Sequence, residues 1–107
     1  QNIIKIGREA RMSQKKQAQR SLQLDIVTPD GLFFSGPVVM VDLPGADGPF
    51  QVLFNHAPLL ARLQPGRLRY CATLEEEKQS VWLGPGFAEI AANKVSVFVS
   101  TAKKTEA

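Results

Sequence analysis

The alternation of apolar and polar residues with a period of two is the feature that most constrains this 107-residue chain. It begins at residues 22–26 and returns in the stretches 38–43, 67–73 and 95–99. Such a period is typical of half-buried β-strands, because successive side chains point to opposite faces. Turn residues interrupt the pattern: Pro29-Asp30-Gly31, Gly36-Pro37, Gly84-Pro85-Gly86 and Ala92-Asn93. We therefore expect an all-β fold of about nine to ten short strands, an antiparallel β-sandwich or a barrel.

The charge of the chain is distributed unevenly. Residues 1–20 hold six bases and one acid, whereas residues 21–107 hold seven bases and nine acids. The basic character therefore belongs to the first segment, and a case for nucleic-acid binding would rest on that segment alone.

These differences divide the chain into three parts. Residues 1–21 form a basic N-terminal arm, helical or disordered, with too few apolar residues for a core-facing stripe. Residues 22–102 form the single folded domain, and residues 103–107 form a short polar tail. Several origins stay open for the arm: a tag or upstream sequence through residue 11, an organellar presequence, or a functional segment.

The sequence offers no combination of residues for independent catalysis. His56 is the only histidine and Cys71 the only cysteine, so a metal site built on several such ligands is excluded. No Gly-x-Ser-x-Gly elbow or Gly-rich phosphate loop is present. We predict a protein that is not an enzyme, with no cofactor and no metal. It has no apolar run of the length of a transmembrane helix.

Three large apolar residues fall on the strand faces opposite the predicted core. Met40, Trp82 and Phe98 alternate with the valines and leucines that we assign to the core. Together they predict an exposed apolar patch of the kind used in protein interfaces. The alternative is that sheet twist, a bulge or a covering loop buries them.

The central part of the chain resembles the epsilon subunit of F-type ATP synthases, whose mitochondrial counterpart is called delta. The family pattern is roughly L-P-G-x-x-G, then N/G-H-A-P-L-L, then L-x-P-G. The matching residues are Leu43-Pro44-Gly45-Ala46-Asp47-Gly48, Asn55-His56-Ala57-Pro58-Leu59-Leu60 and Leu63-Gln64-Pro65-Gly66. Flanking matches extend the resemblance over about residues 22–102.

The resemblance implies a ten-stranded β-sandwich in the central stalk, between the gamma subunit and the c-ring. It implies that the loop of Asn55, His56, Ala57 and Pro58 faces the c-ring and that one sheet face docks on gamma. We place Met40, Phe98 and Trp82 on that gamma-docking face as a hypothesis from strand parity. For His56 two roles stay open: a hydrogen bond that holds the adjacent turn, or direct contact with the c-ring.

The sequence departs from the family pattern in two places. Pro49 and Gln51 stand where the family often carries an acidic residue and a glycine, which puts an acidic contact with the ring in doubt. The usual pair of C-terminal helices, which would begin near residues 101–104, is missing from the sequence. We therefore expect neither ATP binding nor the inhibitory insertion that the helices provide.

The favoured interpretation is a non-catalytic rotor subunit of an F-type ATP synthase, with gamma and the c-ring as partners and no nucleic acid. It would be peripheral, at the cytoplasmic face of a bacterial inner membrane, although a mitochondrial matrix or plastid stroma stays open. The alternative is a free-standing β-sandwich that binds nucleic acid or an anionic surface through its basic arm.

Overall fold

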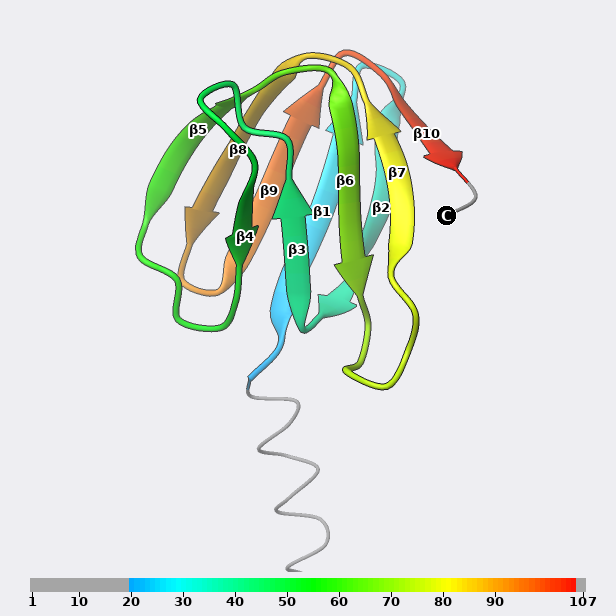
Figure 1. Cartoon of the computed structure of the whole chain (residues 1–107). Helices are drawn as coiled ribbons and strands as arrows, with labels where there is room; N and C mark the ends of the chain where they lie inside the picture. The colour runs from blue at the N-terminus through cyan, green and yellow to red at the C-terminus, as the bar shows by residue number, and fades with distance from the viewer. Residues whose placement is uncertain (1–19, 106–107) are drawn as a thin grey trace, which may run out of the picture.

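The computed structural model describes residues 20–105, which form ten β-strands and no helix (Figure 1). The predicted all-β sandwich is confirmed. The strands are β1 (Leu22–Thr28), β2 (Gly31–Val38), β3 (Met40–Leu43), β4 (Phe50–Val52), β5 (Leu59–Leu63), β6 (Gly66–Cys71), β7 (Gln79–Leu83), β8 (Gly86–Ala91), β9 (Lys94–Val99) and β10 (Ala102–Thr105).

The strand β10 changes one predicted boundary. Lys103–Thr105, which we assigned to a polar tail, pair antiparallel with β7 in the sandwich. Their polar sequence contains no apolar alternation from which this edge strand could be predicted, although Ala102 packs against the core. The predicted arm lies outside the described residues apart from Arg20 and Ser21.

Two five-stranded sheets form the layers of the sandwich. Sheet A has the order β2-β1-β9-β8-β5, and sheet B has the order β10-β7-β6-β3-β4. All neighbouring strands are antiparallel except β1 and β9, which are parallel. Each strand runs opposite to the strand before it in the chain, so the two odd-numbered strands β1 and β9 point the same way (Figure 1).

The core lies between the inner faces of the two sheets. One side chain in two along most strands is buried there, as the period of two predicts. Each buried valine, leucine or isoleucine stabilises the fold by roughly 1.5–3 kcal/mol through removal of apolar surface from water. The cluster comprises Leu22, Leu24, Ile26, Val38, Val41, Leu43, Val52, Leu63, Leu68, Val81, Leu83, Ala88, Ile90, Val95, Val97 and Val99.

The connections gather at two opposite ends of the sandwich (Figure 1). At the end that we call the upper end lie residues 29–30, 44–49, 64–65, 84–85 and 100–101. At the lower end lie residues 39, 53–58, 72–78 and 92–93. The motif of residues 43–66 is therefore divided, with its Pro-Gly turns at the upper end and its histidine loop at the lower end.

The two Pro-Gly turns of the motif hold each other at the upper end. The Gln64 N–H donates to the Pro44 carbonyl at 3.0 Å. A Cβ atom at Gly66 would lie 2.8 Å from the Cβ of Pro44, closer than real Cβ atoms approach. Gly48 completes the first turn with φ of +130°, a conformation that favours glycine. Packing between the turns thus accounts for the two Pro-Gly elements of the motif.

Candidate functional site

The loop of Asn55, His56, Ala57 and Pro58 joins β4 to β5 at the lower end. The backbone N–H of His56 donates to the Leu53 carbonyl at 3.1 Å. Nδ1 of the His56 ring lies 2.7 Å from the Ala57 carbonyl oxygen. Because a carbonyl only accepts, Nδ1 carries the proton in this bond. The predicted hydrogen bond of His56 to the adjacent turn is therefore confirmed, while contact with the c-ring stays a prediction.

Two hydrogen bonds between Asn55 and Asn93, which we call the clasp, fasten this loop to the turn between β8 and β9. The Asn55 N–H donates to Oδ1 of Asn93 at 2.7 Å, and Nδ2 of Asn93 donates to Oδ1 of Asn55 at 3.3 Å. Both residues have positive φ, 64° and 60°, which asparagine tolerates better than most residues. The Asn93 carbonyl also accepts the N–H of Gln23 at 2.9 Å. Asn93 thus joins three segments, a role that its position in a turn did not indicate.

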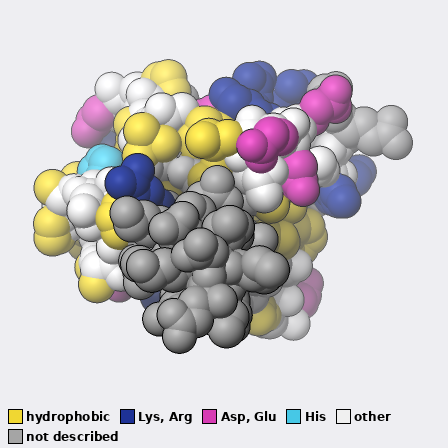
Figure 2. All heavy atoms as spheres, turned by 90° about the horizontal axis from the view of Figure 1, so that it is seen from below, with side chains coloured by type: hydrophobic (Ala, Val, Ile, Leu, Met, Phe, Trp, Pro, Cys, Tyr) yellow, Lys and Arg dark blue, Asp and Glu magenta, His cyan; other side chains and the backbone are white. Residues whose placement is uncertain are grey.

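The lower end also contains a hollow of about 640 Å³ beside the histidine loop. Its lining is mostly apolar and includes Pro37, Leu53, Phe54 and Leu74. Figure 2 looks at this end and shows the single histidine on one side and acidic side chains on the other, with apolar side chains between them. The lower end thus combines the only histidine with apolar surface.

An apolar row crosses the outer face of sheet A. The strand register places Leu32 opposite Val27, Val27 opposite Phe98, and Phe98 opposite Phe87. We call these four residues the aromatic row. Leu32 is 61% exposed, Phe87 46% and Phe98 38%. The two phenylalanine rings pack with their centroids 5.2 Å apart. The prediction that Phe98 is exposed is confirmed. The sequence pattern did not predict that the other three residues of the row lie beside it.

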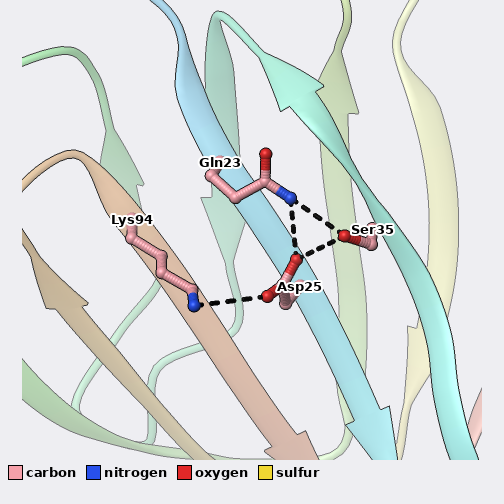
Figure 3. A network of polar contacts seen from close by, with 4 residues as sticks. All are labelled: Gln23, Asp25, Ser35 and Lys94. Atoms are coloured by element: carbon pink, nitrogen blue, oxygen red, sulfur yellow. Dashed lines mark hydrogen bonds and ion pairs between the residues drawn. The ribbon is translucent and has the colours of Figure 1, made fainter.

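A polar network lies next to the aromatic row on the same face (Figure 3). Oδ1 of Asp25 accepts hydrogen bonds from Gln23 at 2.9 Å and Ser35 at 2.7 Å, and Oδ2 lies 3.5 Å from the Lys94 ammonium. The hydrogen bonds from Gln23 and Ser35, with a smaller contribution from Lys94, hold the Asp25 pKa below its ordinary value of 3.8. The network thus fixes an ionised carboxylate beside the apolar surface.

The three residues that we assigned to one gamma-docking face do not share a face. Met40 is only 9% exposed and lies opposite the buried Cys71 at the lower end of sheet B. Strand parity predicts the face of a side chain but not what covers that face near a strand end, so the expected exposure of Met40 is wrong. Trp82 is 46% exposed, but it projects from sheet B, whereas Phe98 projects from sheet A.

Two conventional features are absent from the part of the chain that the structure describes. Among residues 20–105, no group of three or more histidine, cysteine or carboxylate side chains is placed to hold a metal ion. The same residues include no helix of the length and apolarity needed to cross a membrane.

The role of Asn93 can be tested by hydrogen exchange. We expect Asn93→Gly to speed exchange of the Asn55 amide roughly three- to tenfold, because the variant keeps the positive φ but loses a bond of about 0.5–1.5 kcal/mol. Ala92→Gly, at φ of 50° in the same turn, is the control and should leave that rate unchanged. Equal rates in Asn93→Gly and the parent chain would contradict the clasp.

The Asp25 network predicts a pH-dependent contribution to stability. Because the folded pKa is lowered, ionised Asp25 stabilises the fold above pH 3.8, and this stability is lost as pH falls through the folded pKa. Asp25→Asn should cost about 1 kcal/mol at neutral pH, and the difference from the parent should shrink below pH 3.8. Denaturant unfolding across pH measures it, with the exposed Asp47→Asn as control. A difference that does not change with pH would refute this assignment.

Comparison with known proteins assigns the domain. Residues 21–105 match the family model of the ATP synthase delta/epsilon chain, β-sandwich domain. The chain is 44% identical to the ATP synthase epsilon chain of Chlorobium limicola over 77 residues, which cover 72% of this chain and 86% of the relative. It is 42% identical over 88 residues to the epsilon chain of Nitratidesulfovibrio vulgaris strain DP4, covering 82% of this chain and 64% of the relative.

Solved structures agree on the fold. A chain of the Euglena gracilis mitochondrial ATP synthase, in a structure of OSCP, F1 and the c-ring, aligns with a TM-score of 0.73 and 21% identity, over 79% of this chain and 54% of its own length. A chain from the central stalk and c-ring of the Tetrahymena thermophila mitochondrial ATP synthase aligns with a TM-score of 0.62 and 15% identity, over 76% of this chain and 64% of its own. The chain thus spans less than two thirds of these two and of the Nitratidesulfovibrio relative. From the family match and these identities, the chain belongs to the delta/epsilon family of ATP synthase subunits, of which it carries the β-sandwich domain.

Proposed function

We propose that this chain is a non-catalytic central-stalk (rotor) subunit of an F-type ATP synthase, which links the gamma subunit to the c-ring and couples ion translocation to ATP synthesis. The family match and the curated relatives named epsilon chain support this role. Structural neighbours come from assemblies that contain F1, the c-ring and the central stalk of mitochondrial ATP synthases. In this role the chain is peripheral to the membrane, at the cytoplasmic face of a bacterial inner membrane.

The aromatic row is the single observation that carries this proposal. A linking subunit needs an apolar surface that stays exposed until its partner binds, and the row crosses four of the five strands of sheet A. Aromatic side chains at the centre of such a surface contribute strongly to binding. The proposed gamma-docking face is therefore the outer face of sheet A, with Phe98 and Phe87 at its centre and the Asp25 network beside it.

Charge introduced into the aromatic row tests the docking face. Phe87→Glu and Phe98→Glu should each weaken binding of purified gamma subunit roughly ten- to a hundredfold, because docking would bury an unpaired carboxylate. Trp82→Glu, on the other sheet, is the matched control and should bind gamma as the parent does. Equal losses at Trp82 and Phe98, measured by titration calorimetry on folded variants, would refute docking through sheet A.

The c-ring contact is proposed for the loop of Asn55, His56, Ala57 and Pro58. Three of these residues are exposed and His56 is half-buried, while the clasp with Asn93 holds the loop in one shape. A preformed loop loses little conformational entropy when it binds a partner. Pro49, the departure that we expected to alter the ring contact, lies in the connection 44–49 at the opposite end. One flat ring surface cannot contact both.

Site-specific crosslinking decides which end meets the ring. Ala57→Cys and Asp47→Cys place thiols at the exposed tips of the lower and upper ends, and the only native thiol, Cys71, is buried. In an assembled complex whose c subunits carry a cysteine in their polar loop, we expect a disulfide with Ala57→Cys and none with Asp47→Cys. The reverse result would reject the loop assignment while leaving the central-stalk role intact.

A further inference from the structure

The outer face of sheet B presents the only tryptophan of the chain between two cations. The register places Arg67 on β6 and Lys103 on β10 directly opposite Trp82, one on each side. Opposite residues of antiparallel strands have Cβ atoms about 4.5–5.5 Å apart, so all three side chains leave the sheet together. Trp82 remains 46% exposed between them. In the aromatic row of sheet A, by contrast, the phenylalanine pair has a cation on one side only, Arg62 opposite Phe87, and Val27 on the other.

Three cations of this face, Arg67, Arg69 and Lys103, form no ion pair among the described residues. Asp42 is the carboxylate of the face, and it already pairs with Lys78 at 3.1 Å and accepts a hydrogen bond from Gln51 at 3.0 Å. Arg69 lies opposite Asp42 in the register but forms no ion pair with it. Arg67, Arg69 and Lys103 therefore leave this part of the described structure with an uncompensated positive charge.

Both arginines also line a shallow hollow of about 470 Å³ next to Trp82. Gln51 and Gln64 add amide groups to the lining, and Phe50 and Pro49 add apolar surface. Guanidinium groups bind carboxylates through paired hydrogen bonds that match their planar geometry. The hollow thus offers a site for acidic side chains, with an indole beside it for an apolar one.

We propose that the outer face of sheet B binds an acidic polypeptide segment of a partner protein, with carboxylates at Arg67 and Arg69 and an apolar side chain on Trp82. The charge of the face is complementary to such a segment. A single-stranded nucleic acid fits less well, because successive bases need several aromatic rings and only one is present. The proposal is independent of gamma docking, which we assign to the opposite face.

The single tryptophan makes the test direct. A short peptide of alternating glutamate and leucine, titrated into the isolated chain, should shift Trp82 emission to shorter wavelength and reduce acrylamide quenching in a saturable way. Arg67→Glu with Arg69→Glu should weaken this binding at least tenfold. Arg62→Glu, which removes an exposed cation from sheet A, is the matched control and should leave the affinity unchanged.

The outcomes separate the proposal from its competitors. If the charge-reversed variant does not fold, judged by circular dichroism, Arg67→Gln with Arg69→Gln replaces it, and the same loss is expected. Absence of a saturable signal, or an equal loss in Arg62→Glu, overturns the proposal. Tighter binding of single-stranded oligothymidylate or of anionic lipid vesicles than of the peptide also overturns it, because the face would then select phosphate rather than carboxylate.

Discussion

The parallel pairing of β1 with β9 is the interaction on which the outer face of sheet A depends. It places β1 between β2 and β9. Although β9 is far from β1 in the sequence, Val27 therefore lies beside Phe98. Without this pairing Phe98 and Phe87 would still be neighbours, but Val27 and Leu32 would not extend their surface. The same pairing brings Lys94 opposite Gln23 and close to the Asp25 carboxylate. The position of β1 between β2 and β9 therefore brings together both the aromatic row and the Asp25 network on this face.

The sandwich separates different kinds of surface in space. Sheet A carries the aromatic row and the Asp25 carboxylate, which pairs with Lys94. Sheet B carries unpaired cations near Trp82. The upper end carries the two packed Pro-Gly turns, and the lower end carries the histidine loop held by Asn93. The domain can in this way offer several partners separate contacts. This arrangement suits a subunit that links other components of an assembly.

The period of two predicted the fold class and most of the core, since Leu22, Leu24, Ile26, Val95 and Val97 are all buried as expected. Periodicity carries no information on which strands are neighbours, however. The placement of Phe98 and Trp82 on different sheets, and the addition of Phe87 to Phe98, depend on strand order and register, which long-range pairing decides.

The sequence also could not reveal contacts that depend on loop geometry. Met40 has the parity of an exposed residue, yet its side chain is only 9% exposed. The clasp between Asn55 and Asn93 joins residues 38 positions apart, and either asparagine alone indicates only a turn. The hydrogen bond between His56 and Ala57 could be predicted from the sequence, because it joins neighbouring residues.

Hydroxyl-radical footprinting of the subunit, alone and within an assembled central stalk, tests the central claim most directly. The claim is that the outer face of sheet A is covered by gamma. Oxidation of Phe87 and Phe98 should fall strongly on assembly, whereas oxidation of the lower-end residue Leu74, which is 83% exposed in the isolated chain, provides the reference for each sample. Undiminished oxidation of both phenylalanines in the assembled stalk would contradict the account.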